Sequence, residues 1–315
     1  MNSVTIISAA TAIKNFDELR ERARKLGPKR VGVVVADDDV ALLAAAGAAE
    51  LGLAIPVLIG DEAKIRAKIR DMDLMALISE AMFVGAADSS AAAAKAARMA
   101  RDGEVDILLK GHLRTDELLH AVLDKEHGLR TGRLLSDVLL YEDTLCGYRR
   151  LVGITDGGLN VAPTFDQKKQ IVLNAVDVMH AIGITRPKIA LMSATEAVSD
   201  SVPSTTDAGK LTELAARGEF GDAEVYGPLA LDNALLESAA KAKGITSTVA
   251  GHADCMVVPN IESGNLLGKA VKYLGGSQCG HVVVGARVPV LIPSRVESVD
   301  DKINSVSLGV LAHGR

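Results

Sequence analysis

The residues best suited to chemistry gather in the segment IPSRVESVDDKINSV, residues 292–306. Ser294, Arg295 and Asp301 place a hydroxyl, a guanidinium and a carboxylate within eight residues. Such a set can supply a hydrogen-bond donor, a clamp for an oxyanion or a phosphate, and a general base, which together suffice for acyl transfer. A structural interpretation competes, in which Asp301 caps a helix, Arg295 pairs with a surface acid and Ser294 ends a strand. Local chemistry alone favours that structural interpretation.

A strand and a helix are predicted to position this segment. The preceding run PVLIP is apolar, as a buried strand is, and Ser298 followed by Asp301 resembles a capping box. We therefore expect a helix to begin at Ser298. In an open α/β sheet, the loop between the carboxyl end of a strand and the next helix is where anionic ligands bind. Ser294 and Arg295 are thus predicted to lie in an anion-binding loop.

A second group of candidates follows the predicted strand at residues 106–109. The basic side chains there are Lys110, Arg114, Arg130 and Arg133. Together they could form an anion pocket in an otherwise acidic protein. A solvated helix face explains them as well, and local composition favours that second interpretation.

The third candidate is the turn SVPSTTDAGKL, residues 201–211. The hydroxyls of Ser204, Thr205 and Thr206 precede a helix that is predicted to begin near Asp207. Helix capping and phosphate binding both explain this cluster, and the sequence leaves the choice open.

The signatures of several other enzyme classes are absent. The sequence contains neither GxGxxG after a strand nor the phosphate loop GxxxxGK[ST], and it lacks GxSxG and HExxH. Dinucleotide binding, ATP hydrolysis, α/β-hydrolase chemistry and zinc proteolysis therefore lose support. The seven scattered histidines are interpreted as core or surface groups, and no metal site is predicted.

Composition narrows the class of protein further. A chain of 315 residues with 48% hydrophobic content can bury a large core, as two domains or one large α/β unit. Its net charge of -5 gives no global attraction for nucleic acid or anionic membranes. Three cysteines lie far apart without CxxC spacing, and the first residues lack the pattern of a signal peptide. We expect reduced thiols and a cytoplasmic location, with no nucleic acid or membrane partner.

Apolar runs alternate with helical segments over most of the length, which predicts parallel strands joined by crossover helices. The apolar stretch 41–60 is interpreted as a buried helix followed by a strand, since Glu50 and Pro56 make it a poor membrane span. The predicted strands are residues 30–36, 56–60, 106–109, 188–193, 255–259, 281–285 and 289–293. The predicted helices include residues 89–103, 166–184, 231–245 and 262–276.

These segments, in their order and spacing, resemble the phosphate acetyl/butyryl transferase family, and its butyryltransferase branch in particular. The resemblance covers most of the chain. It rests on LLKG, GLRTGRLLSDV, SVPSTTDAGKL, YGPLALDNALLESAAKAKGI, DCMVVPNIESGNLLGKAVKYLGG and SRVESVDDKINSV.

The resemblance implies a fold similar to that of isocitrate and isopropylmalate dehydrogenases. Two α/β domains would enclose a cleft, the first built from residues 1–140 plus 290–315 and the second from residues 141–289. The chain would cross between them twice. A single continuous sheet, or packing of the residues after Pro293 on the middle domain only, would overturn this prediction. A homodimer or larger homo-oligomer is expected.

The resemblance also implies the activity. Acyl-CoA and inorganic phosphate would be converted directly into acyl phosphate and free CoA, with butyryl or another short acyl group favoured over acetyl. Coenzyme A would be a substrate, with no permanently bound cofactor and no metal. Two other functions remain open: a regulatory protein that binds CoA or acyl phosphate with little turnover, and a metal-dependent dehydrogenase of similar fold.

Roles for individual residues follow from the same resemblance. Ser294 would hydrogen-bond the CoA sulfur, and Arg295 would stabilise the oxyanion on the acyl carbonyl. Asp301, which matches the acid of the acetyltransferase branch, would act as base toward the CoA thiol. One departure is His120, where relatives often have arginine. The expected substrate-binding residues are Arg130 and Arg133, placed on the cleft wall facing Ser294, with Lys110, Thr206 and Asn265.

Overall fold

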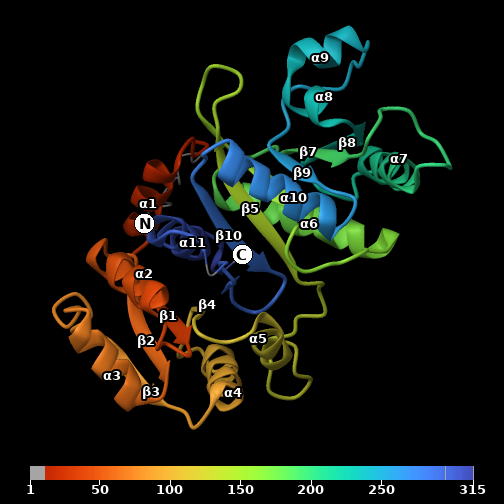
Figure 1. The fold of residues 1–315 in the computed structure, drawn as a ribbon. Coiled ribbons are helices and arrows are strands. Elements are labelled where there is room, and N and C mark those ends of the chain that lie inside the picture. The colour runs from red at the N-terminus through yellow and green to blue at the C-terminus, as the bar shows by residue number, and fades with distance from the viewer. Residues whose placement is uncertain (1–10, 295, 315) are drawn as a thin grey trace, which may run out of the picture.

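The computed structural model describes residues 11–294 and 296–314. Within them the chain forms eleven strands in a single sheet, with helices on both faces (Figure 1). The strands are β1 Lys29–Val34, β2 Ala54–Gly60, β3 Met82–Gly85, β4 Ile107–Lys110, β5 Ser136–Asp143, β6 Arg150–Thr155, β7 Lys188–Met192, β8 Glu224–Leu229, β9 Cys255–Val257, β10 Cys279–Val284 and β11 Val290–Leu291. The helices are α1 Phe16–Lys25, α2 Asp39–Glu50, α3 Glu62–Asp71, α4 Ser89–Arg101, α5 Thr115–Val122, α6 Phe165–Ala181, α7 Pro203–Ala216, α8 Leu231–Leu235, α9 Glu237–Ala242, α10 Ile261–Lys269 and α11 Val299–Ala312, with a π-helical turn, η1 Ala270–Leu274, directly after α10.

Each of the seven apolar runs predicted as strands contains a strand of the sheet. Most of their residues are buried, because helices cover both faces of the sheet. The apolar stretch 41–60 is a helix followed by a strand, as predicted, since α2 ends at Glu50 and β2 begins at Ala54. Within the described residues, no helix is both long and apolar enough to cross a membrane.

The sheet is mixed, with its antiparallel part at the centre. The strand order is β3-β2-β1-β4-β11-β10-β5-β6-β9-β7-β8. β10 runs antiparallel to both of its neighbours, β11 and β5, and β5 is also antiparallel to β6. The expectation of parallel strands is therefore wrong for this central part. Apolar runs indicate where a strand lies but carry no information on its direction.

Segments from both expected domains contribute to this one sheet. β1 to β4 and β11 form one end, β6 to β9 form the other, and β5 and β10 connect them (Figure 1). Separate sheets in two domains are therefore not found among the described strands. The chain returns to its first part near the end of the sequence, as expected, because β11 pairs with β4 and α11 packs against α1 and α2. The domain boundaries at residues 140 and 290 remain a prediction.

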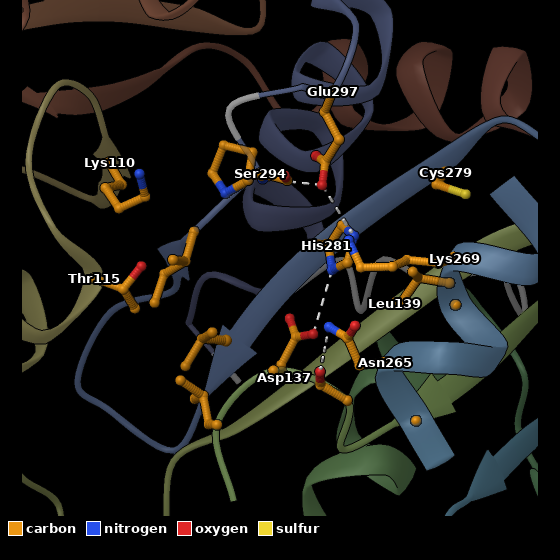
Figure 2. A pocket seen from close by; sticks show the side chains of 18 of the residues that line it. Lys110, Thr115, Asp137, Leu139, Asn265, Lys269, Cys279, His281, Ser294 and Glu297 are labelled. Atoms are coloured by element: carbon orange, nitrogen blue, oxygen red, sulfur yellow. Dashed lines mark hydrogen bonds and ion pairs between the residues drawn. The ribbon is translucent and has the colours of Figure 1, made fainter. Parts of the chain in front are cut away.

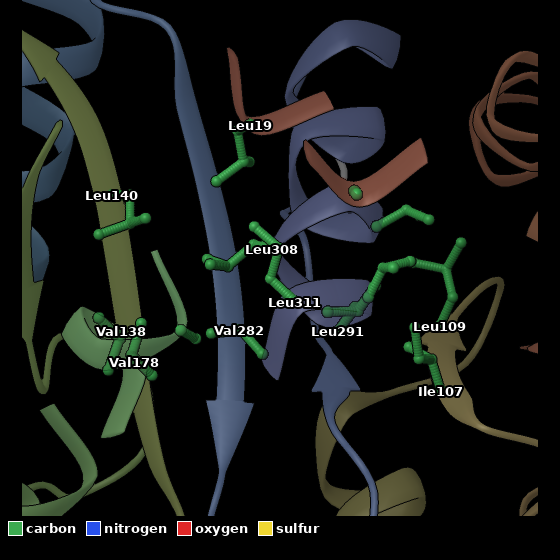
Figure 3. Close-up of a cluster of buried hydrophobic side chains, with 14 of the residues drawn as sticks. Leu19, Ile107, Leu109, Val138, Leu140, Val178, Val282, Leu291, Leu308 and Leu311 are labelled. Carbon is green, nitrogen blue, oxygen red and sulfur yellow. The ribbon is translucent and has the colours of Figure 1, made fainter. Parts of the chain in front are cut away.

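Different sets of helices cover the two faces of the sheet. On one face, Val138 and Val282 of the central strands pack in the same cluster as Leu308 and Leu311 of α11 (Figure 3). On the opposite face, α4 and α5 cover the end that carries β1 and β4. α8, α9 and α10 cover the other end of that same face. The central strands β5 and β10 lie between these two groups of helices.

Several helix boundaries differ from the prediction. α7 begins at Pro203 rather than near Asp207, because proline is well suited to the first turn of a helix. The predicted helix at 231–245 is divided into α8 and α9, with Leu236 in an extended conformation between them. α11 follows Ser298, whose side chain forms the predicted capping box with Asp301.

Candidate active site

One face of the central strands forms the floor of the main pocket. In the antiparallel register, His281 lies opposite Leu139 and Val283 lies opposite Asp137. Because side chains alternate between the faces of a sheet, these four side chains share one face. All four line a cavity of about 470 Å³. The floor is therefore partly apolar and carries one acid and one imidazole.

The pocket walls come from both ends of the sheet. One wall is the connection from β4 to α5, from Lys110 at the end of β4 to Thr115 at the start of α5. The opposite wall is α10, which lies so close to the loop after β6 that a Cβ on Gly264 would be 2.7 Å from Cα of Gly157. This close approach lets Nδ2 of Asn265 donate a hydrogen bond to the carbonyl oxygen of Gly157 at 3.3 Å.

The loop between β11 and α11 completes the pocket and carries Ser294 (Figure 2). Ser294 is exposed, and its backbone N–H donates to Oε1 of Glu297 at 2.9 Å. Among the described residues, its hydroxyl has no hydrogen-bond partner and is free to meet a ligand. Arg295, predicted to act beside it, lies outside the described residues.

Cationic side chains outnumber acids around the pocket. The charged residues that line it are Lys110, Arg114, Lys269, Lys272 and His281 against Asp116, Asp137 and Glu297. Arg114 and Asp116 form an ion pair at 2.9 Å, and Lys272 pairs with Asp301 behind the lining, so neither pair adds net charge. Lys110, Lys269 and His281 then stand against Asp137 and Glu297. The pocket is thus a local positive region in a chain of net charge -5, which favours an anionic ligand.

His281 lies between two carboxylates of the pocket (Figure 2). Its Nδ1 is 3.3 Å from Oδ2 of Asp137, and its Nε2 is 3.5 Å from Oε1 of Glu297. Burial disfavours the charged imidazole, but Asp137 and Glu297 outweigh it and raise the pKa of His281 to about 9. His281 is therefore a cation at neutral pH.

Asp301 lies behind the pocket rather than in its lining. It is 1% exposed, and its carboxylate pairs with Lys272, accepts a hydrogen bond from Ser298 Oγ at 2.6 Å and accepts another from Cys279 N at 3.0 Å. Burial opposes the charged form, but these donors hold the pKa of Asp301 below its usual value. The carboxylate is ionised and already has three partners.

Arg133 lies on the opposite face of the sheet from the pocket. Its Nη1 is 2.7 Å from Oδ2 of Asp177 on α6, and it lines a separate hollow of about 180 Å³ with Val284. Val284 follows Val283 in β10, so its side chain points away from the pocket floor. Arg130 is exposed and does not line the pocket either. The predicted position of these arginines facing Ser294 is therefore corrected.

The remaining predicted residues divide into two groups. Lys110 and Asn265 line the pocket together with Ser294, although they come from opposite ends of the sheet. Thr206 lies in the first turn of α7, where its hydroxyl donates to the carbonyl oxygen of Pro203 at 2.8 Å, and it does not line the pocket. His120 is exposed on α5 and is also outside the lining.

Sequence reasoning missed six charged residues that line the pocket: Asp116, Asp137, Lys269, Lys272, His281 and Glu297. Their positions along the chain do not cluster, so no local motif marks them. The available signal was a histidine at one end of an otherwise apolar strand, which is unusual where both faces are covered. Within the described residues, no group of three or more His, Cys, Asp or Glu side chains is placed to hold a metal ion.

Comparison with known proteins matches residues 86–310 to the family described as "Phosphate acetyl/butaryl transferase". A phosphate acetyltransferase of Rickettsia prowazekii is 42% identical over 300 residues, covering 94% of this chain and 84% of the relative. A phosphate butyryltransferase of Clostridium beijerinckii is 39% identical over 304 residues, covering 96% of this chain and 99% of the relative.

Solved structures agree with this match at the level of the fold. A branched-chain phosphotransacylase from Enterococcus faecalis superposes with a TM-score of 0.77 at 29% identity, covering 90% of this chain and 98% of that one. A putative 4-hydroxythreonine-4-phosphate dehydrogenase from Salmonella typhimurium reaches a TM-score of 0.56 at 13% identity, covering 90% of this chain and 99% of that one. The second likeness concerns the fold alone, and the predicted likeness to isocitrate and isopropylmalate dehydrogenases is not established by it.

Proposed function

Because the chain belongs to the phosphate acetyl/butyryl transferase family and is an acyltransferase, we propose that it transfers a short acyl group between coenzyme A and inorganic phosphate in the main pocket. One observation carries the proposal. The exposed Ser294 lies at the edge of a cavity that combines a cationic rim with a partly apolar floor. Those are the features needed to hold phosphate groups beside a short acyl chain.

The two kinds of lining have separate roles in binding. Lys110, Lys269 and Lys272 attract inorganic phosphate and the phosphates of coenzyme A. Leu139 and Val283 offer apolar contact to the acyl chain. The apolar part of the floor supports a butyryl or similar short chain over acetyl. Coenzyme A is a substrate in this proposal, and no permanently bound cofactor takes part.

The reaction is a direct exchange. An oxygen of hydrogen phosphate attacks the thioester carbonyl carbon, a C–O bond forms, the C–S bond breaks, and the proton that the phosphate loses passes to the departing CoA thiolate. An acyl-enzyme on Cys279 is disfavoured, because burial raises the pKa of its thiol to about 12. Ser294 also lacks a base, since the pocket histidine, His281, is protonated.

Roles at the reacting atoms follow the family pattern. Ser294 would donate its hydroxyl to the CoA sulfur, and Arg295 would stabilise the carbonyl oxygen as it becomes negative. Asp301 would accept the thiol proton in the direction that forms acyl-CoA. For that step, Lys272 must first leave the Asp301 carboxylate, because the two are paired.

Three residues predicted to bind substrate lie outside the pocket lining. Arg130, Arg133 and Thr206 could contact only a part of coenzyme A that extends beyond the cavity. We also propose a cytoplasmic location. The protein is further proposed to form a homodimer or larger homo-oligomer, and sedimentation of the purified protein would test this oligomeric state.

The decisive experiment is a thiol-release assay with purified protein, acyl-CoA and phosphate, without metal or nicotinamide. Acetyl-, propionyl- and butyryl-CoA are compared, and reactions without phosphate measure background hydrolysis. Phosphate-dependent release of free thiol, reduced in Ser294→Ala, is the expected result. Tight binding of CoA without release would indicate a regulatory binding protein, and activity only with metal and nicotinamide would indicate a dehydrogenase.

A further inference from the structure

We propose that His281 is a positioning residue for acyl transfer: as an imidazolium it links Asp137 on β5 to Glu297, and Glu297 holds the loop that carries Ser294. The inference rests on the proposed function for its catalytic consequence, and on geometry for the link itself. His281 comes from β10, so three separate segments of the chain meet at this one ring.

The connection can be followed atom by atom (Figure 2). Oδ2 of Asp137 is 3.3 Å from Nδ1 of His281, and Nε2 of His281 is 3.5 Å from Oε1 of Glu297. The same Oε1 accepts the backbone N–H of Ser294 at 2.9 Å. The main chain of Ser294 is thus joined to the strand floor through two side chains.

The protonation state decides whether this link can exist. A carboxylate only accepts hydrogen bonds, and a neutral imidazole has one N–H and therefore one donor. Only the imidazolium can donate to Asp137 and Glu297 at the same time. On Glu297 the imidazolium faces Oε1, the same oxygen that accepts the Ser294 amide, while Oε2 is buried and has no hydrogen-bond partner among the described residues.

The surroundings of the ring favour the imidazolium. Asp137 faces it from β5, Glu297 from the loop before α11 and Asp301 from α11, while Lys269 and Lys272 approach from α10 and η1. The acids prevail over burial, so the pKa of His281 is raised to about 9 from an ordinary value near 6.5. The link is therefore fully present below pH 6.5 and is lost as pH rises through about 9. An alkaline limb in turnover is the expected consequence.

The experiment compares wild type with His281→Gln in three measurements. The amide of the new side chain can donate to one carboxylate but cannot bridge both, so kcat is expected to fall about 10- to 100-fold, as a small misplacement of a reacting group does. KM for acyl-CoA should change far less. The alkaline limb of kcat near pH 9 should disappear. His281→Lys, which keeps a cation with several donors, should recover part of the turnover at neutral pH.

Two readouts do not depend on activity. The NMR signal of the His281 imidazole can be assigned because it is missing from the spectrum of His281→Gln. In the wild type this imidazole should titrate near pH 9. Hydrogen exchange at the amide of Ser294 should be faster in the variant, because that amide donates to Glu297. These readouts test the link even if the wild type shows no phosphate-dependent thiol release, which would refute the proposed function only.

An exposed histidine provides the matched control. His127→Gln, which alters a residue paired with Asp124 away from the pocket, should keep wild-type turnover and pH profile. If His281→Gln does not fold, Glu297→Gln replaces it. This variant keeps an acceptor for Ser294 and should move the imidazole titration to lower pH. Two results would overturn the inference. One is turnover of His281→Gln within twofold of wild type with an unchanged alkaline limb. The other is a wild-type imidazole that titrates at or below pH 6.5.

Discussion

Replacing Lys272 with methionine should destabilise the protein much more than the loss of a surface ion pair does. Lys272 pairs with Asp301, and their side chains are 23% and 2% exposed. Breaking a fully buried pair costs about 3 to 5 kcal/mol, whereas exposed pairs contribute about 0 to 1 kcal/mol. For a pair buried on the acid side only, we expect Lys272→Met to lower the free energy of unfolding by about 2 to 3 kcal/mol.

The two partners should respond unequally. Lys272→Met leaves a buried carboxylate with the hydroxyl and backbone N–H of Ser298 and the Cys279 amide as donors, and no cation. Asp301→Asn instead removes the buried charge, and the ammonium of Lys272 can then be hydrated, so a loss of about 1 kcal/mol is expected. Since the two side chains are in contact, the double variant should lose less than the sum of the single variants.

Urea unfolding at pH 7 measures these free energies, and steady-state kinetics on the same samples separates structure from chemistry. If Asp301 is the base, Asp301→Asn should reduce acyl-CoA formation about 10²- to 10⁴-fold. Lys272→Met should mainly raise KM for acyl-CoA, because it removes a cation from the pocket. Lys241→Met breaks an exposed helical pair with Glu237 and serves as the control, with a change below about 0.5 kcal/mol. Two results would refute the reasoning. One is a loss in Lys272→Met as small as that of the Lys241→Met control. The other is a double variant whose loss of unfolding free energy equals the sum of the losses in the two single variants.

Three further changes test other parts of the structure. Arg295→Ala should lower turnover about 10²- to 10³-fold with an unchanged thermal melt, because the carbonyl oxygen becomes negative only in the transition state; near-normal turnover in a folded variant would remove Arg295 from the chemistry. Arg133→Ala should leave both KM values within about twofold, since Arg133 pairs with Asp177 on the other face of the sheet; a tenfold rise would restore its predicted role. Gly285→Ala should lower the free energy of unfolding by about 2 to 3 kcal/mol, because Gly285 has φ +101 and a Cβ there would be 2.2 Å from Leu134 O. Gly276→Ala, with φ +67 and open space, should lose only about 1 kcal/mol in the same urea experiment.

Apolar runs predicted seven of the eleven described strands, but they left out β3 and β6, which are mainly apolar, and β5 and β8, whose composition is mixed. β8 contains Gly227 and Pro228, which are unfavourable within strands, and its residues 224–229 were not recognised. β5 begins with Ser136 and Asp137 and ends with Glu142 and Asp143, so only its middle is apolar. Neither strand direction nor strand order is encoded in such runs. The mixed centre of the sheet therefore required the structure.

The site divides in a similar way. Ser294 and the capping box at Ser298 could be predicted, because a strand, a short loop and a helix follow one another in sequence. The contact between His281 and Asp137 could not, because it depends on the register between β5 and β10. The position of Arg133 was wrong for the same reason. The basic residues near Arg133 in sequence suggested a single pocket. In the structure, Lys110 lines the pocket on one face of the sheet and Arg133 lies on the other face.

The pairing of β11 with β4, and of β10 with β5, also affects how a nascent chain can fold. Leu108 pairs with Val290, and Leu139 lies opposite His281, so two central strands find partners that the ribosome makes much later. Until then, β4 and β5 each present an unpaired edge, which is prone to wrong pairing and aggregation. The pocket floor and the Ser294 loop form only after β10 and β11 have been synthesised. A shortened chain should therefore lose the site together with the centre of its sheet.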